Sequence, residues 1–235
     1  HRFIQAYQSV TGLTLGELWA IPIMLRLALI ENLRRVAARV MADWRYRGKA
    51  ARWADVMAAT AESDPKSVVL VVADMARSDP PMTGPFVAEM ARRLQGQSPA
   101  LALPLSWIEQ RLSESGQSIE HLIQLEAQQQ AADQVSISNS IGSLRTLAAI
   151  DWREFTEQCS LVEHSLRSDP SSIYAAMDFA TRDRYRHVVE SIARHHQLEE
   201  QGVADAAIAL SQAGAGSHQP LANHVGYYLI DKGQP

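Results

Sequence analysis

Hydrophobic residues recur every three or four positions along this chain, and the longest such run extends from Thr14 to Trp44. This spacing places the side chains on one side of an α-helix. The recurring positions are Leu18, Pro22, Leu25, Leu29, Leu33, Val36 and Val40. Thr14 and Glu17 form a capping box, in which each side chain bonds a free backbone N–H, so the helix should begin at Leu15.

The first half of this helix is apolar on nearly every side, because more apolar residues fill the positions beside the stripe. They are Ile21, Met24, Leu27 and Ile30. We therefore predict a buried central helix, with Leu29 in a packed core and a bend at Pro22, which removes one intrahelical hydrogen bond. The run from Leu18 to Ile30 contains Arg26 and is shorter than the roughly 20 apolar residues of a membrane-spanning helix.

The same periodicity predicts helices along almost the whole chain, whereas the alternating pattern of strands is nearly absent. Three Ser-Asp-Pro tripeptides, beginning at Ser63, Ser78 and Ser168, predict helix starts with Asp as the N-cap. The fold class is therefore all-α, a single multi-helix domain around two long central helices. The expected helices cover about 2–11, 15–42, 44–61, 65–77, 83–95, 100–115, 119–149, 151–167, 171–176, 179–196 and 201–213.

Only the segment from Gly214 to Ser217 has the composition of a flexible linker. We expect the all-α domain to cover residues 1–213, with a linker at 214–220. A C-terminal coda at 221–235 follows, and its sequence is compatible with either a strand or a docking arm.

The second long helix, predicted over 119–149, begins after Ser118 as its N-cap. Small residues occupy roughly one side of it, which would let another helix approach closely. They are Ala127, Ala131, Ser138 and Gly142. We expect this side to pack against the helix from Thr14 to Trp44. The alternative is that its many polar residues line a path for a saccharide.

Composition limits the kind of protein this is. The 235 residues are 46% hydrophobic and 20% charged, which is typical of a globular chain. A net charge of −4 gives no reason to expect a nucleic-acid partner. Cys159 is the single cysteine and suits a reducing compartment. The chain has no signal peptide and starts at His1, so we expect it to be a piece of a longer protein.

Motifs for nucleophilic catalysis, phosphate cradling or zinc binding are missing from the sequence. Asp183, His187 and Glu190 share one side of a predicted helix, but the arginines around them would oppose a metal cation. We therefore assign no catalytic, cofactor-binding or metal-binding residue.

One helix, predicted over 179–196, offers a candidate interaction face of mixed charge. Its members are Arg182, Asp183, Arg186, His187 and Glu190. Two interpretations fit this pattern: a solvated face with ion pairs one turn apart, or a surface that docks onto another protein. Both predict that Arg186→Ala leaves the isolated chain folded.

Four long runs, in the same order, resemble the N-terminal region of bacterial cyclic β-1,2-glucan synthases. They are GELWAIPIMLRLALIENLRR (16–35), QAADQVSISNSIGSLR (130–145), DWREFTEQCSLVE (151–163) and MDFATRDRYRHVVE (177–190), with NHVGYYLIDKG near the end. In that family this region precedes membrane helices, a glucosyltransferase domain that uses UDP-glucose, and a phosphorylase-like domain. The resemblance implies a segment on the cytoplasmic side of the bacterial inner membrane, without a transmembrane helix or cofactor of its own.

The resemblance implies a non-catalytic accessory domain of a membrane-associated parent glycosyltransferase for cyclic β-glucan synthesis. Its partners would be the remaining domains of that synthase and β-1,2-glucan. Two alternatives stay open. One is a helical glycan-acting enzyme with two opposed carboxylates, and the other is a helical partner-binding module unrelated to sugar.

Overall fold

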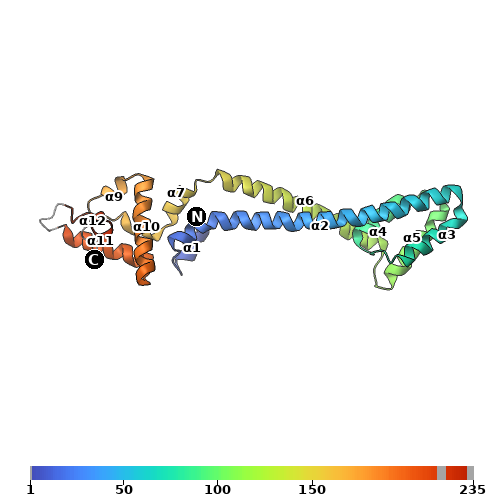
Figure 1. Cartoon of the computed structure of the whole chain (residues 1–235), viewed down its shortest axis with the longest axis horizontal. Coiled ribbons are helices and arrows are strands. Elements are labelled where there is room, and N and C mark those ends of the chain that lie inside the picture. Colours follow the sequence, from blue (N-terminus) through green and yellow to red (C-terminus); the bar gives the residue numbers. More distant parts are fainter. Residues whose placement is uncertain (1, 216–220, 232–235) are drawn as a thin grey trace. The chain divides into compact units, whose positions relative to one another are not determined.

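The computed structural model describes residues 2–215 and 221–231, and every regular element within these ranges is helical (Figure 1). The predicted all-α fold is confirmed. The elements are α1 (Arg2–Gln8), α2 (Leu15–Ser63), η1 (Pro65–Ser67), α3 (Val68–Arg77), α4 (Gly84–Leu94), η2 (Pro99–Leu101), α5 (Ala102–Ser113), α6 (Ile119–Ala149), α7 (Trp152–Cys159), α8 (Leu161–Leu166), α9 (Ile173–Ala176), α10 (Phe179–His196), α11 (Glu200–Gly214) and α12 (Val225–Leu229).

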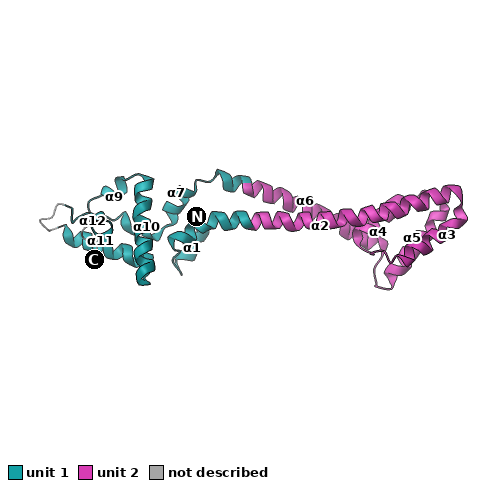
Figure 2. Ribbon diagram, in the orientation of Figure 1, with its two compact units in different colours: residues 1–27, 145–235 teal, residues 28–144 magenta. Residues whose placement is uncertain are grey.

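The chain divides into two compact units, where the sequence led us to expect one domain (Figure 2). Unit 1 comprises residues 1–27 and 145–235, and unit 2 comprises residues 28–144. Both long helices, α2 and α6, contribute to both units. Most of the expected linker, residues 216–220, lies outside the described residues, as do residues 232–235 of the coda, so the predicted boundaries stay a prediction.

Helix α2 is a single helix of 49 residues, so the predicted separation into 15–42 and 44–61 is wrong. Its start is the predicted capping box: Thr14 Oγ1 accepts from the Glu17 N–H at 3.2 Å, and Glu17 Oε2 accepts from the Thr14 N–H at 2.9 Å. Pro22 lies inside the helix and does not end it. One proline removes one hydrogen bond, which the remaining ladder of a long helix tolerates.

The apolar first half of α2 is not the buried centre that we predicted. Leu15 and Leu18 are buried in unit 1, but Met24 and Leu27 are exposed, and Leu29 in unit 2 is only half-buried. Apolar residues on every side of a helix show that it could be buried, but they do not show which other helices pack against it. None of the described helices combines the length and apolarity needed to cross a bilayer.

The core of unit 2 forms where the C-terminal half of α2 meets α3, α4, α5 and the start of α6. Met57, Met75, Phe86 and Ile108 are fully buried there. Each helix turns a stripe of apolar residues inward, the arrangement that the periodicity of three and four predicts. This part of α2 therefore is the packed central helix that we expected closer to Thr14.

Helix α6 packs against α2, as predicted, but through polar residues in place of the small ones. Ala127, Ala131, Ser138 and Gly142 are exposed. The contacts inside unit 2 pair Arg39 with Asp133, Arg47 with Glu126, and Asn32 with Ser136 and Ser140. The prediction that the small residues of α6 face α2 is therefore wrong.

Unit 1 builds its core from α8, α10, α11 and α12. Val189 of α10, Ala204 of α11, and Val225 and Leu229 of α12 are all buried. The part of the coda that the structure describes is therefore a short helix packed into this core, and neither a strand nor an extended arm.

The three Ser-Asp-Pro tripeptides behave differently. Asp64 caps η1 as predicted, accepting from the Lys66 N–H. Asp79 takes a left-handed conformation with φ of 45°, and the next helix begins at Gly84, so this prediction is wrong. Asp169 is buried and bonds the C-terminal segment, while α9 begins only at Ile173. An Asp-Pro pair marks the end of a helix in all three places. It does not predict which backbone N–H the Asp side chain will bond.

Candidate functional site

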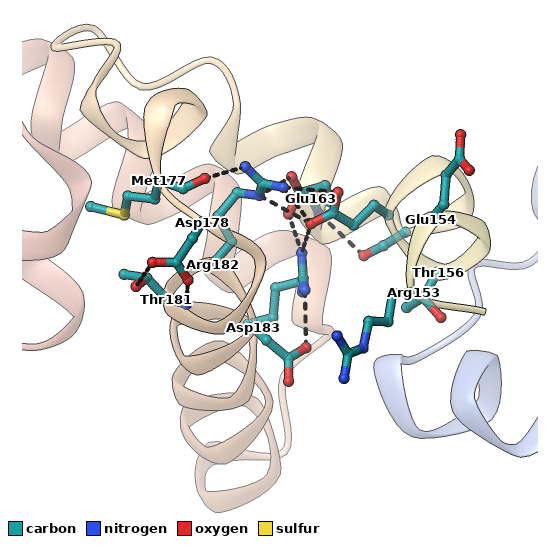
Figure 3. Close-up of polar contacts among 12 residues, drawn as sticks. Arg153, Glu154, Thr156, Glu163, Met177, Asp178, Thr181, Arg182 and Asp183 are labelled. Carbon is teal, nitrogen blue, oxygen red and sulfur yellow. Dashed lines mark hydrogen bonds and ion pairs between the residues drawn. The ribbon is translucent and has the colours of Figure 1, made fainter. Parts of the chain in front are cut away.

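Three of the five residues in the predicted interaction face belong to a cluster of charged side chains in unit 1 (Figure 3). Four helices contribute to it. The members are Glu157 from α7, Glu163 from α8, Arg167 at the end of α8, Tyr174 from α9, and Arg182, Asp183 and Arg186 from α10.

The local sequence explains why these helices converge. Ser160 stops α7 and starts α8, because its Oγ accepts from the Glu163 N–H at 3.2 Å as an N-cap. The single helix predicted over 151–167 is therefore wrong. The break places Glu163 in the first turn of α8, facing the interior. Asp178 caps α10 as predicted, accepting from the Thr181 N–H at 2.9 Å.

Glu163 is the centre of the cluster, and its side chain is completely buried. Its Oε2 accepts from Arg186 Nη1 at 2.5 Å and from the Tyr174 hydroxyl at 2.7 Å. Its Oε1 accepts from Arg167 Nε at 2.8 Å and lies 3.4 Å from Arg182 Nε. Both oxygens of this carboxylate are therefore occupied by donors from the protein itself.

A second carboxylate, Glu157, sits beside the first. Arg182 Nη2 donates to both of its oxygens, at 2.8 Å to Oε1 and 2.9 Å to Oε2. Arg186 Nη1 lies 3.3 Å from Glu157 Oε1, and its Nη2 donates to Asp183 Oδ1 at 3.0 Å. The Arg186 guanidinium also covers the ring of Phe179, 5.0 Å from its centroid. Such stacking suits the planar, weakly hydrated guanidinium.

Three carboxylates and three guanidinium groups make the cluster electrically balanced. Burial would raise the pKa of Glu163, but hydrogen bonds from Tyr174, Arg167 and Arg186 hold it below its usual value. Burial would lower the pKa of Arg186, but Asp183 and Glu163 raise it. Burial, and then the Glu163 carboxylate, raises the pKa of the Tyr174 hydroxyl. Glu163 and Arg186 are therefore charged at neutral pH, and the Tyr174 hydroxyl is neutral.

This arrangement holds helices together and leaves little capacity for chemistry. A general acid needs a carboxyl group with a raised pKa and a free face toward substrate, whereas Glu163 is ionised and fully occupied. Buried ion pairs cost several kcal/mol to break because the remaining partner stays buried and uncompensated. The cluster is therefore a structural brace that joins α7, α8, α9 and α10.

The predicted face is accordingly divided by the structure. Arg186 is only 1% exposed, so the expectation that it belongs to an exposed face is wrong. Arg182 and Asp183 are part of the same brace. His187 is exposed, with its Nδ1 2.8 Å from the Asp183 carbonyl oxygen, and Glu190 pairs with Arg194 at 2.6 Å. Whether this remaining exposed edge docks onto a partner stays a prediction.

Glu190 also borders a cleft of about 910 Å³ between the start of α2, α10 and the start of α11. Glu200 lies in the same cleft, and its Oε2 accepts from the Leu15 N–H at 2.7 Å. Burial, with added repulsion from Glu190 and Glu17, raises the pKa of Glu200. This carboxylate therefore serves as an additional cap on α2, tying α11 to the helix start.

A second buried contact fastens the C-terminal segment. Asp169 Oδ1 accepts from the Val225 N–H at 3.0 Å, and its Oδ2 lies 2.9 Å from His224 Nδ1. Burial would raise the pKa of Asp169, but bonds from Ser171, His224 and the Val225 N–H lower it. This anchor places α12 against α10 and α11.

Sequence reasoning missed Glu157, Glu163 and Tyr174. The available signal was weak but present, because Glu163 stands among the apolar residues Leu161, Val162 and Leu166. A carboxylate at a core position implies a buried cationic partner. Among the described residues, no group of His, Cys, Asp and Glu side chains is arranged to hold a metal ion.

The chain is similar to a segment of a glucan synthase. It is 33% identical over 233 residues to the cyclic β-(1,2)-glucan synthase NdvB of Rhizobium meliloti (strain 1021). The alignment covers 97% of this chain but only 8% of NdvB. The resemblance predicted from the four runs is thus confirmed, for a short segment of a much longer protein. No protein-family model and no solved structure matches the chain.

Proposed function

We propose that this chain is a non-catalytic accessory domain of a cyclic β-(1,2)-glucan synthase and that it serves as a structural part through which the larger protein assembles. The observation that carries this proposal is its similarity to NdvB along 97% of its own length, within 8% of the relative. The remaining domains of the synthase are its proposed partners. We keep the cytoplasmic side of the inner membrane as its proposed place, and β-1,2-glucan as a further ligand to be tested.

The charged cluster supports an accessory role over a catalytic one. Its carboxylates bond arginines and a tyrosine of the same unit, so these groups join helices and are not free to contact a substrate. Glu200, a carboxylate of unit 1 with a raised pKa, is likewise engaged by a backbone N–H. Sites that act on substrates keep at least one such group free to reach the reacting atoms.

Exchange of segments in NdvB tests the proposal. One strain would carry NdvB without the segment similar to this chain, and a second would carry this chain in its place. The readouts are the amount of intact synthase and the amount of cyclic glucan made per synthase molecule. We expect the deletion to lower both and the exchange to restore both, because the chain supplies the assembly contacts.

Two results would contradict the proposal. If the deleted NdvB makes as much glucan per molecule as the intact protein, the segment has no accessory role in synthesis. If the isolated chain transfers glucose from UDP-glucose above a no-protein control, and Glu200→Gln removes the activity, the domain is catalytic. If the isolated chain transfers no glucose and the deletion strain makes a normal amount of glucan, the segment acts outside glucan synthesis and the proposal is contradicted.

A further inference from the structure

One side of α2 in unit 2 exposes apolar and basic residues together. Ile30, Met41 and Trp44 have exposed fractions of 54%, 57% and 73%. Arg34 is four residues after Ile30, and Arg45 is four residues after Met41, so each arginine lies on the same side of the helix as that apolar residue. Soluble helices usually turn such apolar residues inward. We call this set, extended to Val56, the basic–apolar face.

Positive charge predominates along this stretch. Between Ile30 and Val56 the sequence has seven Lys and Arg residues and three Asp and Glu residues, although the whole chain has a net charge of −4. Arg39 and Arg47 are directed to carboxylates of α6. The remaining basic residues are exposed: Arg34, Arg35, Arg45, Lys49 and Arg52.

Two of the three carboxylates in this stretch are paired with arginines. Glu31 pairs with Arg34 at 2.7 Å, and Asp55 pairs with Arg93 at 2.5 Å. Asp43, the third, is half-buried, and burial raises its pKa. Glu31 therefore offsets Arg34, whereas no ion pair of the described residues joins Arg45, Lys49 or Arg52 to a carboxylate of α2.

A pocket lies at the end of the face. It has a volume of about 440 Å³ and is formed by α2, the segment that follows α3, and Phe86 of α4. Lys49 and Arg52 line it together with the aromatic rings of Trp53 and Phe86. Asp79, the acidic residue in the lining, has a side chain that is 87% exposed, and its Oδ1 lies 3.5 Å from Arg111 Nη2. The pocket thus combines two cations, one carboxylate that Arg111 offsets, and apolar walls, which suits an anionic group attached to an apolar body.

We propose that the basic–apolar face binds the surface of an anionic lipid bilayer, with a lipid phosphate in the pocket beside Lys49 and Arg52. Helices that lie in a bilayer interface present apolar side chains, often including Trp, next to Lys and Arg. Ile30, Met41 and Trp44 would enter the acyl boundary, while the basic side chains meet the head groups. A nucleic acid would gain nothing from these exposed aliphatic side chains. The proposal agrees with the inner-membrane location in the proposed function but rests on different observations. The exposed side chains of α2 support it, whereas the accessory role rests on the similarity to NdvB, so vesicle binding can fail without affecting that role.

Sedimentation of the chain with vesicles tests this inference. One set of vesicles contains phosphatidylcholine alone, and the other also contains phosphatidylglycerol, which is anionic. We expect binding to the anionic vesicles and little binding to the neutral ones. Raising the ionic strength from about 0.1 M to about 1 M shortens the screening length from about 10 Å to about 3 Å, so binding should weaken.

Two variants separate the charged and apolar contributions. The charge variant, Arg45→Gln with Lys49→Gln and Arg52→Gln, should lose at least about tenfold in affinity for anionic vesicles. The apolar variant, Met41→Ala with Trp44→Ala, should also bind more weakly, because insertion is lost. All five side chains are at the surface, so helical content and unfolding midpoints should remain those of the wild type.

Matched controls lie on α3, outside the face. Arg77→Gln removes an exposed basic group, and Leu70→Ala removes an exposed apolar one. Both controls should bind vesicles like the wild type. Failure of the wild type to bind anionic vesicles would overturn the proposal, as would equal losses in the controls. If the apolar variant binds normally and poly-glutamate displaces the vesicles, the face recognises acidic polymers and not lipid, which also overturns it.

Discussion

The two units use charged side chains to join helices in different ways. In unit 1, Glu163 is fully buried and meets three hydrogen-bond donors, within a cluster that connects four helices. In unit 2, Asp133 of α6 meets mainly Arg39 of α2, whose side chain is 45% exposed. Water screens the second contact and not the first, so similar pairs should contribute very differently to stability.

The largest effect is expected at Arg186. Arg186→Ala should lower the free energy of unfolding by about 3–5 kcal/mol, because it leaves Glu163 buried without its closest cation. Denaturant titration of the 235-residue chain measures this loss. Arg184, an exposed neighbour on the same helix, supplies the control, and Arg184→Ala should leave the midpoint unchanged. Equal midpoints for both variants would show that the cluster does not brace unit 1.

Acid should weaken unit 1 through Glu163 of this cluster and through Asp169, which anchors the C-terminal segment. The folded pKa values of Glu163 and Asp169 lie below their unfolded values of about 4. Their ionisation therefore stabilises the fold above about pH 4, and this contribution is lost as the pH falls through the lower folded values. Glu200, whose pKa is raised, acts oppositely, since its contribution is lost as the pH rises through its folded value.

Thermal unfolding of the wild type and of Glu163→Gln across the range from about pH 6 to about pH 2 measures this dependence. The wild type should lose more stability on acidification than the variant, which no longer has this carboxyl group to protonate. Parallel curves for the two proteins would mean that Glu163 is not the ionised centre of the cluster.

A smaller effect is expected at the α2–α6 contact in unit 2. Asp133→Asn should cost about 1 kcal/mol of unfolding free energy, since its arginine partner stays in contact with water. Combining it with Arg39→Gln in a double-mutant cycle isolates the pair. A coupling as large as that between Glu163 and Arg186 would remove the distinction between the units.

The smallest effect is expected at Glu31 and Arg34, an exposed pair one turn apart on α2. Glu31→Gln should leave the unfolding midpoint unchanged within error, because both groups are well hydrated without each other. A measurable loss of stability would show that this side of α2 is covered in solution. It would also contradict the claim that exposed ion pairs contribute much less to stability than buried ones.

Local signals predicted local structure well. The limits of α6 and α10 match the predicted ranges 119–149 and 179–196, since Ser118 and Asp178 each accept a hydrogen bond from the backbone N–H three residues further on. Burial was predicted poorly at Leu29 and Arg186. The periodicity that placed both residues is unaffected by which distant helix covers them, so it could not distinguish a solvated arginine from a buried one.

The candidate site depends on the same kind of distant contact. Glu163 and Arg186 are 23 residues apart, and the break at Ser160 that brings them together contains no proline or glycine. The sequence there is compatible with a continuous amphipathic helix and with a break at which Ser160 caps a new helix. We predicted the continuous helix from the periodicity. Only the fold shows which of the two applies.

Turnover per synthase molecule tests the central claim most directly. NdvB carrying this chain in place of its own segment would be compared with the same protein carrying Glu163→Gln, with cyclic glucan measured per molecule of intact synthase. A structural brace predicts that the variant accumulates less intact synthase, while each surviving molecule keeps its normal turnover. Normal accumulation with turnover lost would show that Glu163 takes part in the reaction, and would contradict a purely structural role for the cluster.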